Sequence, residues 1–294
     1  MSQRKHILIA TLGGQPQVVT FTLDLLLQEG HPISGVIVLH PDVTSQPRLQ
    51  TALQRLSVEF PDGYYRAAQR HILLRSYVLD RNGQPIDDII DSDEHADGIL
   101  DSIHRLIGDL KRQSYLIHLS VSGGRRMISL LALSVASLNF DRHDYIWHIY
   151  TPSNLQEQAH DGNIMHLPAS AGIKLVQVPF PALGAYISPS PTFHSAQEEQ
   201  RLRIETQERT RCTEVVSRAT PAQLKVLQAF AKGLRPQRVA EELAISPVTV
   251  HTHKTVLLSL CRQTWNIPSE EPLDYLFLRD KFSEYLSTSP DEKE

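Results

Sequence analysis

The stretch Ile7-Leu8-Ile9-Ala10-Thr11-Leu12-Gly13-Gly14-Gln15-Pro16-Gln17 decides the fold of the first part of the chain. Its opening residues, Ile7 to Thr11, are uncharged and rich in branched side chains, which predicts a buried strand. Two glycines and a proline end that pattern, and apolar residues at helical spacing follow from Val18 to Gln28. The stretch therefore predicts a strand, a glycine loop and a helix in succession.

Strand-like and helix-like segments alternate on either side of this stretch through the first 180 residues. Further strands are predicted at residues 35–39, 72–79, 115–120 and 145–150, and additional ones at 163–167 and 176–180. Helices are predicted at residues 48–60, 96–111 and 126–139. Such alternation implies βαβ crossovers and a parallel sheet with helices on both faces. We therefore expect a Rossmann-like, doubly wound α/β domain.

A chain of 294 residues suits two domains. Gly184 to His194, with prolines at 189 and 191, interrupts every periodic pattern and predicts a linker. The charged stretch from Ala196 to Val216 predicts either a solvated connector helix or a coiled segment that stabilises a dimer. The expected organisation is an α/β domain at 1–183, a linker and connector helix at 184–217, and a small all-α helix-turn-helix domain with a C-terminal helix at 218–294.

The bulk composition is that of a globular protein, with 41% hydrophobic and 21% charged residues. No apolar run approaches the ~18 residues that a membrane helix needs. Met1 to Lys5 leads into the first strand without a signal peptide, so we expect a cytoplasmic protein with no membrane partner. The two cysteines, Cys212 and Cys261, are too few for a disulfide framework or a zinc site.

A second glycine loop, Ser120-Val121-Ser122-Gly123-Gly124-Arg125-Arg126, also leaves a predicted strand and opens a predicted helix. In a doubly wound sheet the strand order reverses beside the first strand, which places the fourth strand next to it and brings the two loops together. Glycine lets a backbone approach a ligand closely, and a helix N-terminus attracts anions. A tight turn explains a pair such as Gly13-Gly14 equally well.

Two arginines make the second loop more specific. Arg125 and Arg126 stand at a helix start, where the helix dipole disfavours cations, and an anionic ligand would offset that cost. The planar fork of arginine suits phosphate. The chain has neither the Gly-x-x-x-x-Gly-Lys-Ser/Thr sequence of P-loop nucleotide hydrolases nor the Gly-x-Gly-x-x-Gly of dinucleotide enzymes. The two loops thus predict a site for a phosphorylated ligand.

Together, the run from Ile9 to Thr20 and the run Ser122-Gly123-Gly124-Arg125-Arg126-Met127 resemble the CRISPR-associated Rossmann-fold (CARF) proteins, in particular their Gly-Gly-Arg-Lys branch. The resemblance extends over roughly residues 5 to 180. It implies a two-fold homodimer that binds a cyclic oligoadenylate, a second messenger of type III CRISPR complexes, across its axis. The implied ligand-binding residues are Thr11, Leu12, Gly13, Gly14, Gln15, Ser122, Gly123, Gly124, Arg125 and Arg126.

The arginines suit a cyclic tetra-adenylate in particular, because its four phosphates match two copies of Arg125 and Arg126. Some CARF domains also cleave the ring without a metal, by aligning a ribose 2′-hydroxyl with its phosphate and stabilising the developing charge. For such a ring nuclease, the resemblance implies the catalytic residues Arg126, Thr11, Gln15 and Ser122. The chain departs from the branch at Arg126, where lysine is expected, and at Met127, where a hydroxyl or amide is expected. No cofactor is expected.

The spacing of the fourteen histidines predicts no metal site. His251 and His253 are two residues apart on a predicted helix and point to different faces, unlike the i,i+4 pair of a zinc helix. His118 and His148 lie inside predicted strands, where we expect hydrogen-bonded structural roles.

The C-terminal region carries start and stop signals for three helices. Thr220-Pro221 and Ser246-Pro247 each pair an N-cap hydroxyl with a proline at the first helical position, Gly233 ends the first helix, and Pro236 opens the second. The apolar residues expected to pack these helices are Leu224, Leu227, Val239, Leu243, Ile245, Val250 and Leu257. From residue 220 to 265 there are six basic residues against two acidic ones. Beyond them, residues 272–286 predict a packing or dimer helix.

Thr220 to Leu260 resembles the LuxR-type helix-turn-helix. The resemblance is carried by the runs Ala231-Lys232-Gly233-Leu234, Val239-Ala240-Glu241-Glu242-Leu243 and Ile245-Ser246-Pro247-Val248-Thr249-Val250-His251-Thr252-His253. It implies that the third helix enters the major groove of DNA, with base contacts from His251, Thr252 and Thr255 and backbone contacts from Thr249 and Lys254. Lysines common at positions 251 and 255 are absent.

The sequence leaves two functions open. One is a homodimeric regulator that senses a cyclic oligoadenylate and adjusts its DNA binding. The other is a metal-independent ring nuclease, with the helix-turn-helix as an accessory. A helical trio kept only for dimerisation or for gating the ligand site is the alternative to DNA binding.

Overall fold

The computed structural model describes residues 4–87, 91–184 and 190–287, which divide into two compact units, Met1–Glu199 and Gln200–Glu294. Residues 185–189 of the predicted linker lie outside the described residues. The predicted domain boundaries at 183 and 217 stay predictions. Among the residues that the structure describes, no helix has the length and apolar character needed to cross a membrane.

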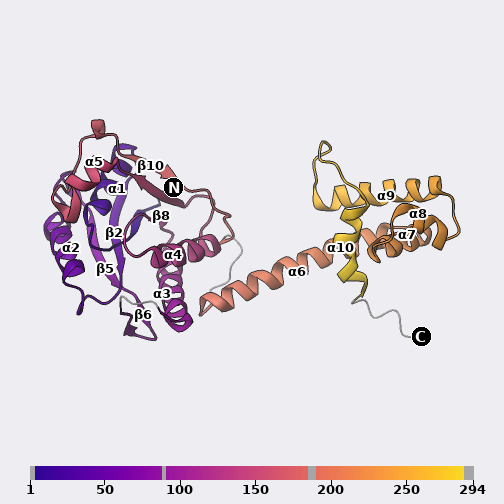
Figure 1. The fold of residues 1–294 in the computed structure, drawn as a ribbon, viewed down its shortest axis with the longest axis horizontal. Helices are drawn as coiled ribbons and strands as arrows, with labels where there is room; N and C mark the ends of the chain where they lie inside the picture. The colour runs from indigo at the N-terminus through magenta and orange to yellow at the C-terminus, as the bar shows by residue number, and fades with distance from the viewer. Residues whose placement is uncertain (1–3, 88–90, 185–189, 288–294) are drawn as a thin grey trace. The chain divides into compact units, whose positions relative to one another are not determined.

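The first unit is built on a six-stranded sheet with the order β10-β9-β8-β1-β2-β5 (Figure 1). Its strands are β1 (His6–Thr11), β2 (Ile33–His40), β5 (Leu73–Val78), β8 (Leu116–Ser120), β9 (Tyr145–Tyr150) and β10 (Lys174–Gln177). The first five run parallel, and β10 pairs antiparallel with β9. Because β1 lies between β2 and β8, the predicted reversal of strand order beside the first strand is confirmed.

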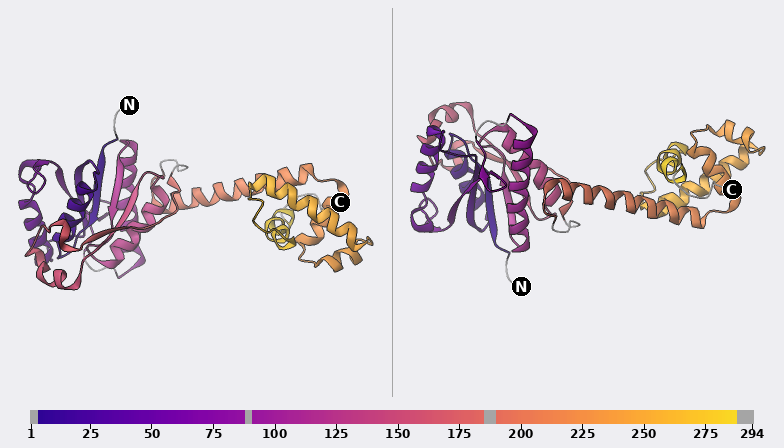
Figure 2. Two further views of the ribbon diagram at one scale, coloured as in Figure 1. Left: turned by 90° about the horizontal axis from the view of Figure 1, so that it is seen from above. Right: turned by 90° about the horizontal axis from the view of Figure 1, so that it is seen from below.

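Helices cover both faces of this sheet (Figures 1 and 2). One face packs on α1 (Gln17–Gln28) and α2 (Pro47–Val58), and the other on α3 (Asp93–Arg112) and α4 (Arg126–Asn139). Successive side chains of a strand point to opposite faces, so Leu8 of β1 joins the core with α1 and α2 while Ile9 joins the core with α3 and α4. The Rossmann-like α/β prediction is confirmed.

Three parts of this unit differ from the sequence-based expectation. The sheet is mixed rather than wholly parallel, because β10 returns along its edge in the opposite direction. Residues 163–167 form no strand; Ile164 and Leu167 instead pack on the small core around Phe21 and Ile173. The remaining elements were not predicted: η1 (Pro61–Gly63), β3 (Tyr64–Tyr65), β4 (Arg70–His71), β6 (Asp80–Arg81), β7 (Gln84–Pro85), α5 (Ser153–Gln158), η2 (His160–Gly162) and η3 (Ala169–Ala171).

The second unit is helical, as predicted. It contains the C-terminal part of α6 (Phe193–Arg218), α7 (Pro221–Ala231), α8 (Pro236–Glu242), α9 (Pro247–Trp265) and α10 (Tyr275–Ser287). The Thr220 side chain caps α7 and the Ser246 side chain caps α9, and Gly233 takes a φ of +86° just beyond α7. Helix α8 begins at Pro236, so all four predicted boundary signals are confirmed.

The core of the second unit joins all five helices. The predicted apolar set lies in or against it, and Phe282 of α10 is fully buried there. A packing role for the predicted C-terminal helix is therefore confirmed. Cys212 and Cys261 are buried, free thiols in the same core, and burial raises their pKa values to about 11 and about 12.

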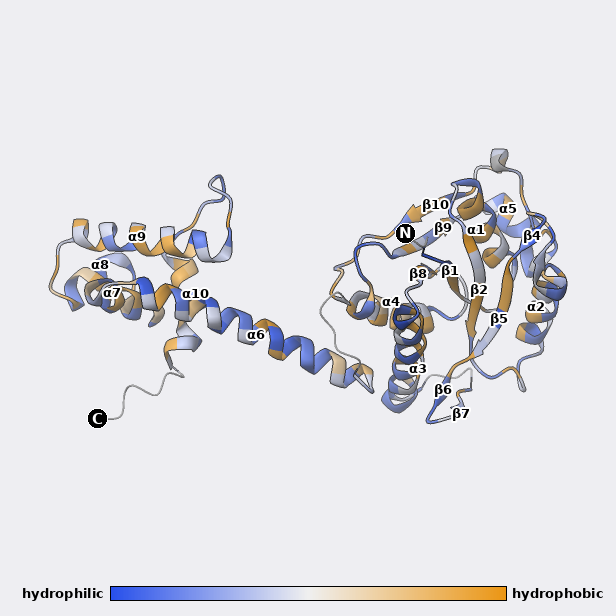
Figure 3. Cartoon of the chain, turned by 180° about the vertical axis from the view of Figure 1, so that it is seen from behind, coloured by the Kyte–Doolittle hydropathy of each residue, from blue (hydrophilic) through white to orange (hydrophobic). Residues whose placement is uncertain are grey.

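Helix α6 contains the whole stretch from Ala196 to Val216 that was predicted as a helix, and most of its length is hydrophilic (Figure 3). Its role as a connector stays a prediction. Its apolar residues Leu202 and Ile204 are each 50% exposed, whereas Val215 is buried in the second core. A dimer-stabilising role for this helix stays a prediction.

Candidate functional site

The two glycine loops meet where β1 and β8 end side by side. Ala10 is paired with Ser120 in the sheet, so both chains leave it at the same level. The Thr11 hydroxyl donates to the carbonyl of Gly123, and the Ser129 hydroxyl donates to the same oxygen at 3.1 Å. The sequence-based expectation that the two loops come together is confirmed.

Contact between the loops explains their glycines. A Cβ on Gly13 would lie 2.9 Å from the Cα of Gly124, and a Cβ on Gly123 would lie 2.1 Å from the carbonyl oxygen of Thr11. Gly124 also has a φ of +73°, in the left-handed region that favours glycine. These three glycines are required by backbone packing, so the case for a ligand rests on what the loops expose.

The loops expose cationic side chains at a helix start. Gly124, Arg125 and Arg126 are all exposed, and α4 begins at Arg126. The first turn of a helix presents N–H groups without intrahelical partners, and at α4 no N-cap side chain accepts a hydrogen bond from them. Two guanidinium groups beside such a turn form an anion-binding surface.

Two of the predicted ligand residues have side chains committed elsewhere. Leu12 is 1% exposed and lies in the core shared with α1 and α2. Thr11 is also 1% exposed, and its hydroxyl holds the two loops together. Their assignments as ligand-binding residues stay predictions.

Ser122 faces strand β9 rather than the Thr11 side of the site. Its hydroxyl accepts the backbone N–H of Ile149 at 2.7 Å and lies 3.1 Å from Nδ1 of His148. The His148 side chain is exposed. His148 therefore places an imidazole beside the predicted site. The sequence indicated His148 only as a residue inside a strand.

Gln15 lies in a polar cluster that the sequence did not reveal. Its Oε1 accepts the backbone N–H of Asp161 at 3.0 Å, and its Nε2 donates to Asp161 Oδ1 at 3.1 Å. Arg48 donates to the same carboxylate oxygen from Nη2 at 2.7 Å and from Nε at 3.0 Å, which lowers the pKa of Asp161. Gly14, Arg48, Arg55 and Asp161 line a pocket of about 260 Å³.

The second site is the exposed surface of α9 near its N-terminus. His251, Thr252 and Thr255 are exposed, while Thr249 and Lys254 are half-buried. The hydroxyls of Thr252 and Thr255 donate to the backbone carbonyls four residues earlier, at 3.0 and 2.9 Å. Helix α8 precedes α9 across a tight turn in which Ala244 takes a φ of +51°. This is the geometry of a helix-turn-helix with one exposed recognition surface.

A third group of side chains lies at the opposite ends of the strands. Within the described residues, His6, His31 and His118 place one ring nitrogen each within 4.8 Å of one another. Their positions in the sequence are too far apart for a spacing rule to detect.

The fold and these sites define a class: a Rossmann-like α/β domain and a helix-turn-helix in one chain. The family model described as CRISPR-associated protein NE0113 (Cas_NE0113) matches residues 15–210. That range is about two thirds of the chain, which therefore belongs to this CRISPR-associated family. The Gly-Gly-Arg-Lys branch stays a prediction.

The model described as bacterial regulatory proteins, luxR family, matches residues 219–259. This range contains α7, α8 and the exposed surface of α9, so the predicted LuxR-type helix-turn-helix is confirmed.

Comparison with solved structures finds Enterococcus italicus Csm6 bound to cyclic hexa-2'-fluoro-hexa-dAMP, at 13% identity and a TM-score of 0.39. The similarity covers 93% of this chain and 56% of that chain, so the chain spans little more than half of that protein's length. A search of the curated proteins finds no match.

Proposed function

We propose that this protein is a CRISPR-linked transcriptional regulator that binds a cyclic oligoadenylate and couples that binding to DNA. The observation that carries the proposal is the exposed Arg125–Arg126 pair at the uncapped start of α4, beside the β1 loop. A multiply charged phosphate ligand is what such a surface stabilises. Membership of a CRISPR-associated family supports a ligand made during the CRISPR response.

The proposed active form is a homodimer that shares one ring. Directly after Arg126, α4 exposes Met127 and Leu130, which are 46% and 53% exposed and lie one turn apart. Contact with a second copy through this face would bury both side chains. It would also bring four arginines around one axis, which matches the four phosphates of a cyclic tetra-adenylate.

The proposed output is DNA binding through α9. His251, Thr252 and Thr255 would face base edges, and Thr249 and Lys254 the phosphate backbone. The LuxR-type match supports DNA as the partner of this surface.

The test uses the full-length protein, cyclic tetra-adenylate and labelled DNA from the promoter of the protein's own gene. Fluorescence anisotropy of the DNA, with and without the ring, should give two different affinities. Equal affinity in both states, with the ring bound, would reject the coupling. A linear tetra-adenylate of equal length serves as the control ligand.

A ring nuclease is the second candidate, and the Ser122–His148 pair favours it. His148 could take the proton of a ribose 2′-hydroxyl while that oxygen bonds to the adjacent phosphorus and the bond to the 5′-oxygen breaks. The products would be a 2′,3′-cyclic phosphate and a 5′-hydroxyl, which takes its proton from water. Arg126 would stabilise the charge that develops on the phosphate.

Incubating radiolabelled cyclic tetra-adenylate with the protein and a chelator tests this second candidate. Linear products that disappear in a His148→Ala variant would support it. An intact ring after long incubation would reject the ring nuclease, and the cyclic oligoadenylate sensor would be the remaining candidate.

A further inference from the structure

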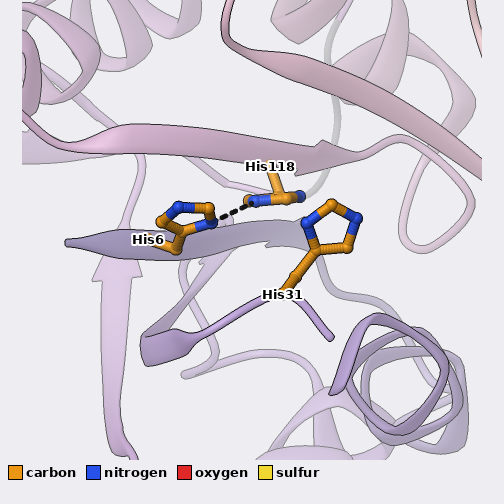
Figure 4. A group of neighbouring side chains, drawn as sticks. All are labelled: His6, His31 and His118. Carbon is orange, nitrogen blue, oxygen red and sulfur yellow. Dashed lines mark hydrogen bonds between the residues drawn. The ribbon is translucent and has the colours of Figure 1, made fainter. Parts of the chain in front are cut away.

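Three histidines that are distant in the sequence meet at the amino end of the parallel strands (Figure 4). His6 is the first residue of β1, His31 lies two residues before the start of β2, and His118 is the middle residue of β8. The first glycine loop leaves β1 at its other end, five residues and about 16 Å beyond His6. The second loop begins at Ser120, two residues after His118 on β8. None of the three histidines is among the residues that the proposed function uses.

The geometry of the three rings approaches that of a metal ligand set. His6 Nδ1 lies 3.1 Å from His118 Nε2, and the ring centroids of His31 and His118 are 4.7 Å apart. Nitrogen ligands bound tetrahedrally at about 2.0–2.1 Å lie about 3.4 Å from one another. The first pair already has nearly this spacing. The side chain of His31 is 22% exposed in the turn before β2, and one of its ring nitrogens lies within 4.8 Å of a ring nitrogen of each of the other two histidines.

The chemical state of the cluster also suits a metal. Burial, together with the neighbouring imidazoles, lowers the pKa of His118 to about 3, and burial and His31 lower the pKa of His6. Neutral imidazole is the form that binds metals, so protons compete little with a cation here. Three imidazoles without a thiolate suit Zn²⁺, Ni²⁺ or Cu²⁺ rather than Mg²⁺ or Ca²⁺.

Metal binding at this cluster depends on the hydrogen bond between Trp147 and His118. The indole N–H of Trp147, which can only donate, lies 3.1 Å from Nδ1 of His118. His118 therefore carries its proton on Nε2 and donates it to His6. To ligate through Nε2, His118 must carry the proton on Nδ1 instead, and its hydrogen bond with Trp147 then breaks. The same chain of hydrogen bonds, without any metal, is the alternative explanation of the cluster.

We infer that His6, His31 and His118 form a binding site for one divalent transition-metal ion, with solvent completing the coordination. The ion would tie the start of β1 and the turn before β2 to the middle of β8. Binding would release Trp147 from His118, which makes the indole a reporter of the site.

The experiment titrates the chelator-treated, full-length protein with zinc chloride by calorimetry and with Co²⁺ by visible absorption. We expect one ion per chain. His31→Gln, at the half-buried ligand, should weaken binding at least about tenfold. Trp147→Phe should tighten it about fivefold, because the competing hydrogen bond is removed. His71→Gln, at an exposed histidine on β4, should leave the affinity unchanged and is the matched control.

The indole provides a second readout that needs no substitution among the three histidines. In a Trp265→Phe background, Trp147 is the remaining tryptophan, and its emission should be quenched by Ni²⁺ at one equivalent. Absence of binding heat and of Co²⁺ bands would overturn the metal site and leave the hydrogen-bonded chain. Zn²⁺ affinity unchanged by His31→Gln would overturn it equally, since the ion would then lie elsewhere.

Discussion

The Thr11 hydroxyl donates a 2.5 Å hydrogen bond to the carbonyl of Gly123, and a Cβ on Gly123 would lie 2.1 Å from the Thr11 carbonyl oxygen. The atoms nearest to such a Cβ belong to the Thr11 backbone, so no flexible side chain can move aside to make room for it. Gly123→Ala should therefore separate the loops and lower the free energy of unfolding by roughly 1–3 kcal/mol. Urea unfolding followed by circular dichroism measures the effect.

The control for this variant is Gly108→Ala in α3. A Cβ there meets only the end of the Arg112 side chain, at 3.4 Å. Alanine favours a helix over glycine by about 1 kcal/mol, so this variant should be neutral or slightly more stable. If both variants unfold at the same urea concentration, the contact between the loops does not contribute to the free energy of unfolding.

Arg126→Ala should weaken binding of cyclic tetra-adenylate sharply. A charge-assisted hydrogen bond contributes about 1.5–3 kcal/mol, and a shared ring would lose one from each protomer, so we expect a loss of at least about a hundredfold. Calorimetry with the intact ring measures it. Arg142→Ala, at an exposed cation in the loop before β9, should bind normally. Unchanged affinity in Arg126→Ala would refute the placement of the ligand.

Lys254→Ala should weaken DNA binding to a similar degree on every sequence tested. A phosphate contact carries no sequence information, and its loss should reduce the slope of log affinity against log salt by about one. Anisotropy measured over a series of salt concentrations gives that slope. Lys225→Ala, on the exposed side of α7, is the control. A slope that stays the same in Lys254→Ala would place the phosphates elsewhere.

His166 should make stability depend on pH. It lies between two carboxylates, with Nδ1 2.9 Å from Asp24 and Nε2 3.0 Å from Glu59, and these hydrogen bonds raise its pKa above the usual 6.5. The stabilisation is complete below the unfolded pKa and is lost as the pH rises through the folded pKa. Wild type should therefore exceed His166→Gln in unfolding free energy by more at about pH 6 than at about pH 9. A gap that is constant with pH would contradict the charged state of His166.

Local signals in the sequence predicted the features that local chemistry controls. The strand, glycine loop and helix from Ile7 onward were predicted because side-chain periodicity changes at Gly13. The caps at Thr220 and Ser246 were predicted because a hydroxyl before a proline suits a helix start. The neighbouring positions of β1 and β8 followed from the topology rule for doubly wound sheets.

Features that depend on distant contacts were not predicted. The Arg48–Asp161 and His6–His118 pairs each join residues about 110 positions apart, for which no spacing rule exists. Residues 163–167 form a short segment with three apolar residues, which is too short for periodicity to separate a strand from a segment packed over a core. Arg125 and Arg126 are exposed as a ligand surface requires, and the glycines are needed by the loop contact, while the assignment of these residues to a ligand stays a prediction.

The burial of both thiols has a practical consequence for measuring this protein. Cys212 and Cys261 are the chain's two cysteines, and at neutral pH a thiol with a pKa of about 11 or about 12 is almost entirely protonated and therefore unreactive. A cysteine introduced at an exposed position would react with a maleimide dye ahead of them. We therefore expect single-site fluorescent labelling to need no cysteine-free background, so that both native cysteines can be kept in the core of the second unit.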